Sequence, residues 1–342
     1  MDILGGFDVH RKQITFDYLE IETGEVKSGQ ITPATREHLR HWLSGFSSNK
    51  RAAFALEATT GWRFVVEELE RAGIEAHLAE PADTKALRGR KKRAKTDRLD
   101  ARHLRELLLI GRLPESWIAP SHIQELRTLV RLRKSLIEDR TAWQQRIHAQ
   151  LFHNGHPQER NLLAKDRRAH LKRLELPPSA RKMVDHALSM IDHINAELAP
   201  IEEELRSYAR RQAGCRALMG HYGIGELTSV AMLSELGDSR RFSSSRKAVR
   251  YAGLDVTVSE SDDKRAPGKI SRQGAPILRW AAFEAAQVAR RAGSPDHEYY
   301  VETRGRLGSN RACLAIARKL IRRAHHTLRE LGEEALGKPL AG

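Results

Sequence analysis

The sequence has few of the residues that stabilise small secreted proteins. Only two cysteines occur among the 342 residues, Cys215 and Cys313. Neither belongs to a Cys-x-x-Cys pair or to a Cys/His set with metal-ligand spacing. A disulfide framework and a structural zinc site therefore have no support, and we expect both cysteines to be buried thiols.

Long apolar segments are also missing. The chain has no stretch of about 18 apolar residues that could span a bilayer, and no basic-then-apolar leader with a small-residue cleavage site. We therefore expect a cytoplasmic protein with no membrane partner. A Gly-x-x-x-x-Gly-Lys-Ser/Thr loop is missing too, so the sequence offers no phosphate-binding loop for ATP.

Acidic residues are outnumbered. Lys and Arg number 59 against 44 Asp and Glu, which gives a net charge of +15 and a pI near 10.1. This excess is larger than solubility requires, and it indicates a polyanionic partner. Apolar residues make up 40% of the chain, enough for a buried core in each of two domains.

The first hundred residues predict an α/β domain. The pattern of apolar residues predicts strands over residues 3–9, 14–20, 26–31, 51–57 and 74–78. Helices are expected over residues 35–44, capped by Thr32 or Thr35, and over residues 62–71. Three strands followed by helix, strand, helix and strand form a ribonuclease-H-like order, which we assign to a catalytic domain over residues 1–118.

Residues 119–210 predict long, charged helices with a break at Pro177 and Pro178. Apolar residues at alternating spacings of three and four form a heptad seam in the second helix: Val184, Ala187, Ile191, Ile194, Leu198, Ile201, Leu205 and Tyr208. The preceding helix has a rougher stripe. The two helices are thus expected to form an antiparallel hairpin, an intermolecular coiled coil, or an ordinary helical bundle. We predict self-association as a dimer or tetramer through this region.

Four acidic residues carry the main chemical signal. Asp8 lies inside an apolar strand, where an unpaired carboxylate costs several kcal/mol. Glu57 ends another strand, and Asp97 and Asp100 are three residues apart on a helix expected to begin near Thr96, so they face the same side. Shared Mg²⁺ or Mn²⁺ ions would compensate these charges. The alternative is that Asp8 pairs with a Lys or Arg and that Asp97 only caps a helix.

A basic segment leads into the helix that carries Asp97 and Asp100. Its cations are Lys85, Arg88, Arg90, Lys91, Lys92, Arg93, Lys95 and Arg98. Such a run is usually a solvated surface, but beside an acidic metal site it would hold a phosphate backbone. We therefore predict nucleic-acid contacts here.

Residues 211–342 predict a third, mostly helical unit. Gly223 and Gly225 resemble the turn of a helix-hairpin-helix element, whose backbone N–H groups bind phosphate. A polar loop over residues 259–268 follows, and four basic residues in and after it are candidate phosphate contacts: Lys264, Arg265, Lys269 and Arg272. The final helix, over residues 312–331, has a basic face that either binds nucleic acid or is simply solvated.

Across nearly the whole chain, these motifs resemble the bridge-RNA-guided insertion-sequence transposases, which join a RuvC-like domain to a C-terminal transposase domain. The Piv-type DNA invertases are relatives of that family. The matching motifs lie at residues 6–10, 56–59, 95–101, 223–225 and 268–274. The resemblance implies that Asp8, Glu57, Asp97 and Asp100 form an acidic DEDD tetrad that binds Mg²⁺ or Mn²⁺.

The resemblance also implies a serine nucleophile nine residues before Ile270, which is Ser261. The family's serine is commonly followed by Gly, whereas Asp262 follows here and Ser259 lies close by, so both serines stay candidates. The family mechanism is transesterification of donor and target DNA, with an element-encoded RNA choosing both by base pairing. Two alternatives remain: a RuvC-like structure-specific nuclease that uses metal-activated water, and a basic architectural protein without enzymatic activity.

Overall fold

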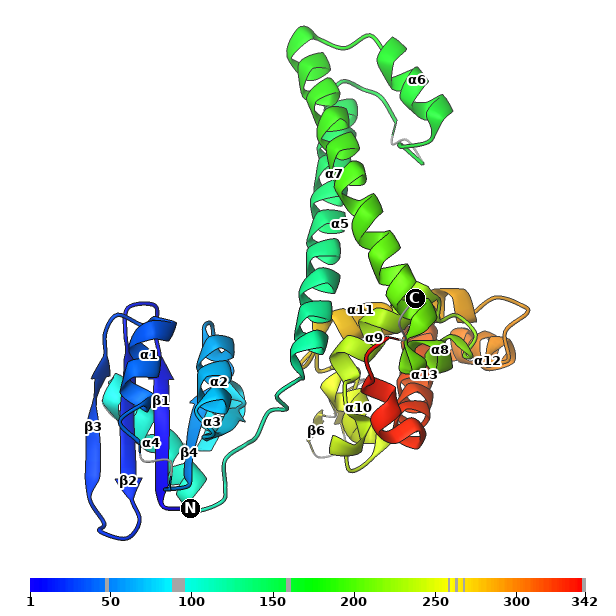
Figure 1. Cartoon of the computed structure of the whole chain (residues 1–342). Helices are drawn as coiled ribbons and strands as arrows, with labels where there is room; N and C mark the ends of the chain where they lie inside the picture. Colours follow the sequence, from blue (N-terminus) through cyan, green and yellow to red (C-terminus); the bar gives the residue numbers. More distant parts are fainter. Residues whose placement is uncertain are drawn as a thin grey trace. The chain divides into compact units, whose positions relative to one another are not determined.

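The computed structural model describes residues 1–46, 49–87, 96–157, 161–257, 259–261, 264–266 and 268–339. The chain divides into two compact units, Met1–Ile118 and Ala119–Gly342 (Figure 1). The first unit is a mixed α/β domain, and the second is mostly helical. This division of secondary structure agrees with the predicted α/β domain followed by helices.

The first unit contains a five-stranded sheet with the order β3-β2-β1-β4-β5. Its strands are β1 (Ile3–Val9), β2 (Ile14–Glu20), β3 (Val26–Ile31), β4 (Ala52–Glu57) and β5 (Glu75–Ala79). Strands β1, β2 and β3 pair antiparallel, whereas β1, β4 and β5 pair parallel. The helices are α1 (Arg36–Leu43), α2 (Trp62–Arg71), α3 (Pro81–Leu87) and α4 (Asp97–Leu109). Thr35 caps α1, as one of the two predicted alternatives requires.

One face of the sheet is covered by α1 and α2 (Figure 1), and aromatic residues pack on the same face. Phe7 on β1 stacks on Phe54 of β4 with ring centroids 4.6 Å apart, and Trp42 of α1 meets Phe7 edge-on at 5.6 Å. Because side chains alternate along a strand, the residues on either side of Phe7 face away from this cluster. Gly6 and Asp8 therefore belong to the opposite face.

That opposite face is covered by α4. A Cβ atom on Gly6 would lie only 2.1 Å from the carbonyl oxygen of Ala101, so the absence of a side chain lets α4 pack directly on β1. Beside this contact, Arg105 of α4 forms an ion pair of 2.6 Å with Asp17 of β2, and both side chains are almost fully buried. Ala55 and Leu104 form a small apolar cluster next to it. These contacts fix α4 against the strands that carry the candidate acids.

The second unit begins with two long helices, α5 (Ser121–His153) and α7 (Pro178–Arg211), which pack side by side (Figure 1). Arg133 pairs with Glu202 at 2.8 Å, and Arg140 donates to Asn195 at 2.9 Å, so the sequence numbers run in opposite directions. The pair is an antiparallel hairpin, one of the three arrangements predicted. Most residues of the predicted seam are buried within the chain.

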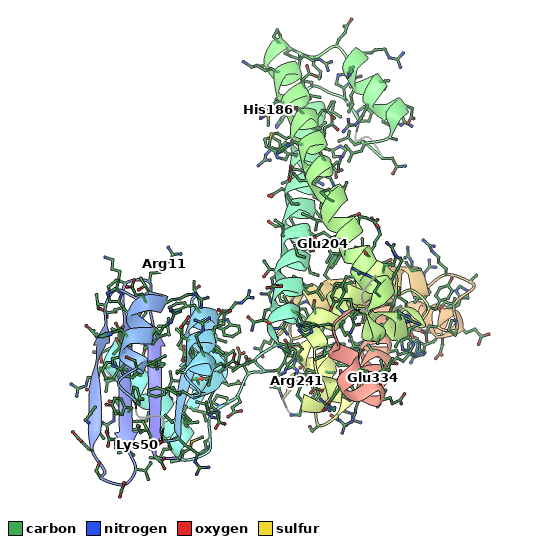
Figure 2. All side chains as sticks on the ribbon, in the orientation of Figure 1. Arg11, Lys50, His186, Glu204, Arg241 and Glu334 are labelled. Carbon is green, nitrogen blue, oxygen red and sulfur yellow. The ribbon has the colours of Figure 1, made fainter. Side chains whose placement is uncertain are left out.

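Helix α6 (Lys165–Arg173) lies at the end of this hairpin, where α5 ends and α7 begins. We call this end the tip lobe and define it as residues 143–157 and 161–195. Leu171 of α6 is buried against Leu151 of α5 and Leu188 of α7 in one apolar cluster. His186, which Figure 2 labels, lies on α7 in this lobe. Its ring meets that of Trp143 edge-on, with the centroids 5.5 Å apart. The tip lobe thus has its own core.

The rest of the second unit is a helical body with short helices α8 to α12 and the long helix α13. The bounds are α8 (Ala213–Met219), α9 (Glu226–Leu236), η1 (Ser239–Arg241), α10 (Ser245–Tyr251), α11 (Pro276–Ala289), α12 (His297–Leu307), α13 (Ser309–Leu331) and η2 (Gly332–Leu336). Cys215 and Cys313 are both buried free thiols, as predicted. Within the described part of the chain, no helix is long and apolar enough to span a bilayer.

The sequence predicted a polar loop over residues 259–268, and within it the structure contains a small antiparallel hairpin, β6 (Ser259–Ser261) and β7 (Lys264–Ala266). An isolated bridge between Val256 and Ile270 continues the pairing below it. Backbone pairing rather than an apolar run defines these strands, so hydrophobic periodicity gave no sign of them.

Candidate metal centre

The strand ends place two of the predicted acids next to each other. Phe7 of β1 pairs with Leu56 of β4 in parallel register, and Asp8 and Glu57 each follow one residue later. Asp8 shares a face with Gly6, and Glu57 shares a face with Ala55. Gly6 and Ala55 both contact α4, so both acids lie on the face that α4 covers.

The first turn of α4 contributes the other two acids. Thr96, rather than Asp97, caps the helix by accepting a hydrogen bond from the backbone N–H of Leu99. Asp97 and Asp100 both lie in this first turn. The positive end of the helix dipole favours carboxylates at this position, so the first turn of α4 is a suitable place for both acids.

A histidine joins the acids. The Nε2 atom of His10 lies 3.2 Å from Oδ2 of Asp8 and 3.6 Å from Oδ1 of Asp97. The amide of Gln13 donates to the other oxygen of Asp97 at 3.1 Å. A turn in which the backbone N–H of His10 donates to the carbonyl of Gln13 brings both side chains to this end of the sheet.

Burial and neighbouring acids disfavour the ionised form of Asp8. Burial raises the pKa of the Asp8 carboxyl; the nearby His10 opposes that rise, while Asp100 and Asp97 add to it. Among the described residues, Asp8 forms no ion pair with a Lys or Arg. The alternative in which a basic side chain neutralises Asp8 therefore has no support within that part of the chain.

The donor atoms fit a small divalent cation. One ligand atom each from Asp8, His10 and Asp97 lies within 4.8 Å of the other two, and this is the one such group within the described residues. Carboxylate oxygens suit Mg²⁺ and Mn²⁺, and a partly desolvated cluster of acids favours a bound cation. Glu57 lies beside Asp8 in the parallel register of β1 and β4. The negative charge of Asp100 raises the pKa of Asp8. Both residues therefore border the same site.

His10 was missed as a candidate ligand by the sequence reasoning. It belongs to the motif at residues 6–10, in which the sequence predicted only Asp8 as a ligand. Its position two residues after Asp8, at the end of a strand, was the available signal, because residues two apart point to the same side while the backbone stays extended.

The predicted basic residues near this site are only partly described. Lys85 at the end of α3 and Arg98 on α4 are exposed. The others lie outside the described residues: Arg88, Arg90, Lys91, Lys92, Arg93 and Lys95. Their contact with nucleic acid stays a prediction.

The C-terminal candidates lie in the second unit. Gly223 has a positive φ of 94° and packs on α11, where a Cβ atom would lie 2.5 Å from the carbonyl oxygen of Ala285, and Gly225 is the residue before α9. Lys269 and Arg272 are exposed. Ser259 and Ser261 lie on β6, and Lys264 and Arg265 lie on β7. The backbone of Ser261 is paired with that of Lys264.

A sheet of this order, with acids at the ends of its first and fourth strands and on the helix that covers them, is typical of ribonuclease-H-like enzymes. Two family models match this chain. One, described as a transposase, matches residues 5–153. The other, described as the transposase IS116/IS110/IS902 family, matches residues 215–301. The first match covers the acidic site, and the second covers β6 and β7.

Individual proteins also resemble the chain. It is 24% identical over 307 residues to the transposase for insertion sequence element IS1111A of Coxiella burnetii, covering 85% of this chain and 81% of that protein. It is 28% identical over 242 residues to the putative transposase y4rJ of Sinorhizobium fredii, covering 64% and 60%. It is 25% identical over 237 residues to the transposase for IS1328 of Yersinia enterocolitica, covering 68% and 70%.

Proposed function

We propose that the protein is the transposase of an insertion sequence, an enzyme that cuts and rejoins DNA. The observation that carries the proposal is the convergence of Asp8, Asp97 and His10 at one edge of a ribonuclease-H-like sheet. The net charge of +15 supports a nucleic-acid substrate. The transposase names of the similar proteins support the reaction class.

In this proposal, Asp8, Glu57, Asp97 and Asp100 hold Mg²⁺ or Mn²⁺. A cation bound there would stabilise negative charge on the oxygens of a phosphodiester during displacement. The chain's own part is to orient these ligands: α4 holds Asp97 and Asp100, and the parallel strand pair holds Asp8 and Glu57. Exposed Lys85 and Arg98 would position the phosphate backbone beside the acids.

The nucleophile in this proposal is Ser261, with Ser259 as the alternative. Attack of the serine oxygen on phosphorus would break the P–O bond to the 3′ or 5′ oxygen of one strand and form a phosphoserine bond, with the serine proton passing to solvent or a base. The energy of the phosphodiester is conserved, so resealing needs no ATP. Donor and target choice by a bridge RNA, and assembly into a dimer or tetramer, belong to the same proposal.

A metal-only nuclease is the second candidate. Asp8, Glu57, Asp97 and Asp100 all lie in the first unit, whereas Ser261 lies in the second. Water could therefore replace the serine in the same acidic site. A covalent protein–DNA product distinguishes the two candidates.

The proposal is tested with Asp8→Asn in the full-length protein. We expect calorimetric Mn²⁺ binding and DNA cleavage to be lost, while DNA binding in EDTA persists because the basic surfaces are unchanged. The matched control is Asp139→Asn, which makes the same chemical change at an exposed position on α5. Cleavage by Asp8→Asn at the wild-type rate would reject the assignment of the acidic site.

A further inference from the structure

The tip lobe carries positive charge that is not fully neutralised. In α6, basic side chains outnumber acidic ones, with Asp166 as its one acid. Arg168 pairs with Asp192 of α7 at 2.6 Å, and Arg167 lies 3.6 Å from Asp166. Among the described residues, no carboxylate forms an ion pair with Lys172 or Arg173. Within that part of the chain, these two cations are available to an anion from outside.

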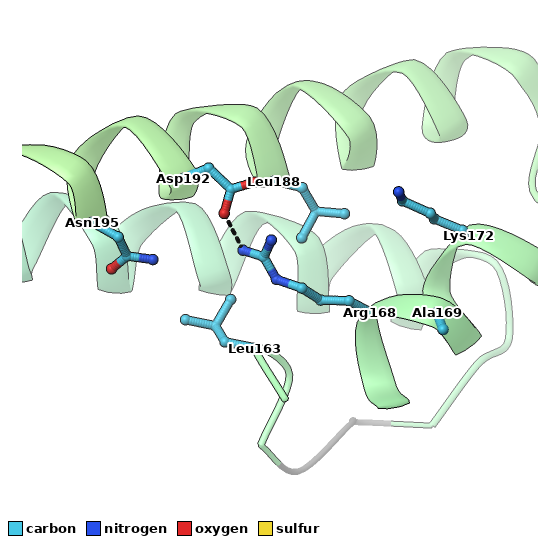
Figure 3. Close-up of a pocket in the computed structure, with 7 residues that line it drawn as sticks. All are labelled: Leu163, Arg168, Ala169, Lys172, Leu188, Asp192 and Asn195. Carbon is cyan, nitrogen blue, oxygen red and sulfur yellow. Dashed lines mark ion pairs between the residues drawn. The ribbon is translucent and has the colours of Figure 1, made fainter. Parts of the chain in front are cut away.

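A pocket of about 500 Å³ lies between α6 and α7, and Lys172 is one of the residues that line it (Figure 3). Its apolar wall is formed by Leu163, Ala169 and Leu188, and its polar wall by Arg168, Lys172, Asp192 and Asn195. The Asn195 oxygen already accepts a hydrogen bond from Arg140. An apolar surface beside fixed polar groups and the exposed ammonium of Lys172 suits a ligand that has both a flat apolar part and a negative charge.

Phe152 adds an exposed aromatic ring to the same lobe. Its exposed fraction is 81%, although its neighbour Leu151 is completely buried in the core of the lobe. Because α5 continues through both residues, the buried Leu151 holds Phe152 on the outer side of the helix. Because this phenyl ring is exposed to water, it contributes little hydrophobic stabilisation to the fold. A flat ring of this kind stacks well on an unpaired base.

We propose that the tip lobe binds a single-stranded segment of nucleic acid. Lys172 and Arg173 contact its phosphates, one unpaired base enters the pocket against Leu163 and Leu188, and another stacks on Phe152. A duplex does not fit this arrangement, since its bases are already stacked and paired. The inference rests on the proposed function for the presence of nucleic acid, but it assigns a site that is separate in sequence from the acidic centre.

An unpaired strand of RNA and one of DNA share this chemistry. Both offer phosphates for Lys172 and bases for Phe152. None of the proposed contacts uses the 2′-hydroxyl, which distinguishes RNA from DNA. The experiment therefore compares labelled single strands of RNA and of DNA, each of about 12 nucleotides, with a DNA duplex of the same length. Fluorescence anisotropy of the full-length protein is measured in EDTA, where metal-dependent cleavage does not interfere.

Phe152→Ala should weaken binding of at least one single strand about fivefold or more, which is the loss expected for one base stack. Phe152→Trp should restore it, because the ring face is kept. Lys172→Ala should lower the slope of log Kd against log salt by about 0.7, the value for one phosphate contact with a single strand. The control Lys338→Ala removes an equal charge at an exposed position outside the lobe and should leave the slope unchanged.

Wild-type affinities and salt slopes in both the Phe152→Ala and Lys172→Ala proteins would overturn the inference. An equal loss of duplex binding would overturn it as well, because stacking on an unpaired base would then not be the cause. A DNA-cleavage assay distinguishes failure of the tip-lobe site from failure of the proposed function. If Asp8→Asn abolishes cleavage while the tip-lobe variants bind like the wild type, the proposed function stands and only the tip-lobe site is rejected.

Discussion

Gly6→Ala tests whether the packing of α4 on β1 positions the acidic site. The added Cβ atom would lie 2.1 Å from the carbonyl oxygen of Ala101 and 2.8 Å from the backbone nitrogen of Arg105. An ordinary carbon–oxygen contact is about 3.3 Å, so α4 must move away by about 1 Å. Both clashing atoms belong to the helix backbone, and no side-chain rotation relieves them.

The movement has two measurable results. Overpacking of this kind costs about 1–3 kcal/mol, and the backbone clash places Gly6→Ala toward the upper end of that range in urea unfolding. Displacing Asp97 and Asp100 from Asp8 by about 1 Å should also weaken Mn²⁺ binding and slow DNA cleavage, the latter by about 100-fold.

Gly45→Ala is the matched control for this change. Gly45 has no left-handed φ, and an added Cβ atom would lie 3.3 Å from the carbonyl oxygen of Trp42. Trp42 belongs to α1, which covers the sheet face opposite to the acids. This variant should bind Mn²⁺ and cleave DNA like the wild type. A Gly6→Ala protein that is folded, binds Mn²⁺ with wild-type affinity and cleaves at the wild-type rate would refute the positioning argument.

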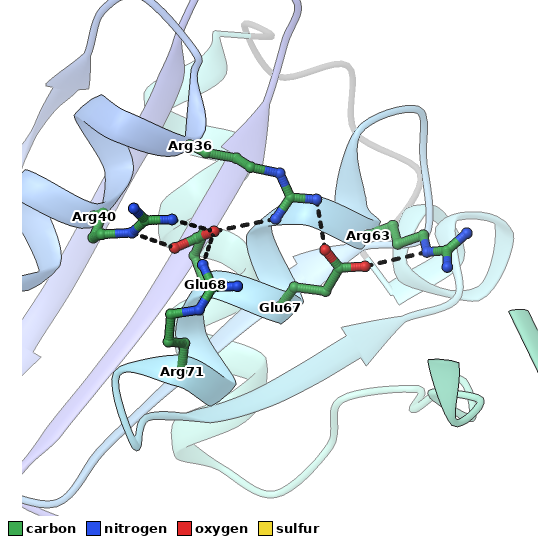
Figure 4. A network of polar contacts seen from close by, with 6 residues as sticks. All are labelled: Arg36, Arg40, Arg63, Glu67, Glu68 and Arg71. Atoms are coloured by element: carbon green, nitrogen blue, oxygen red, sulfur yellow. Dashed lines mark hydrogen bonds and ion pairs between the residues drawn. The ribbon is translucent and has the colours of Figure 1, made fainter. Parts of the chain in front are cut away.

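Three further predictions concern other parts of the chain. Glu68 on α2 is buried among Arg36, Arg40 and Arg71, and hydrogen bonds from these guanidinium groups lower its pKa to about 2 (Figure 4). Because this carboxyl titrates below its ordinary value of 4.5, its stabilisation is complete above that value and is lost as the pH falls toward 2. Glu68→Gln should therefore lower the free energy of unfolding at pH 7 by about 2 kcal/mol, allowing for solvent screening of the arginines, and the gap to wild type in urea melts should close between pH 5 and pH 2. Ser261→Ala should abolish the covalent protein–DNA adduct seen by denaturing electrophoresis; an adduct that survives Ser261→Ala but not Ser259→Ala would move the nucleophile, and an active wild type without any adduct would favour the metal-only nuclease. Light scattering should show a dimer or tetramer with nucleic acid, and a monomer both free and bound would contradict the predicted self-association.

The sheet could be predicted from the sequence because its strands are dense in apolar residues. Residues 3–9, 14–20 and 26–31 form β1, β2 and β3 with the predicted bounds. The face on which Asp8 lies could not be predicted. The alternation of side chains along a strand assigns residues to two faces, but it does not show which face a helix covers. That choice depends on Gly6, whose missing side chain admits α4, and on the buried pair of Asp17 and Arg105.

The parts that escaped prediction depend on contacts between distant segments. The hairpin of β6 and β7 has almost no apolar residues, so its strands have no hydrophobic period. Helix α6 is too polar to show an amphipathic pattern, and it is held in place through Leu171 and the ion pair of Arg168 with Asp192. The position of His10 depends on the turn to Gln13, in which the His10 backbone N–H donates to the Gln13 carbonyl. This turn brings the His10 ring close to both Asp8 and Asp97.

The length of the α5–α7 hairpin sets a distance within the second unit. Helix α5 has 33 residues, which at 1.5 Å per residue extend about 50 Å. On the inference that the tip lobe binds a single strand, this length fixes how far the bound strand lies from the helical body. Removing seven residues from each helix would keep the seam facing inward and bring the tip lobe about 10 Å closer to the helical body.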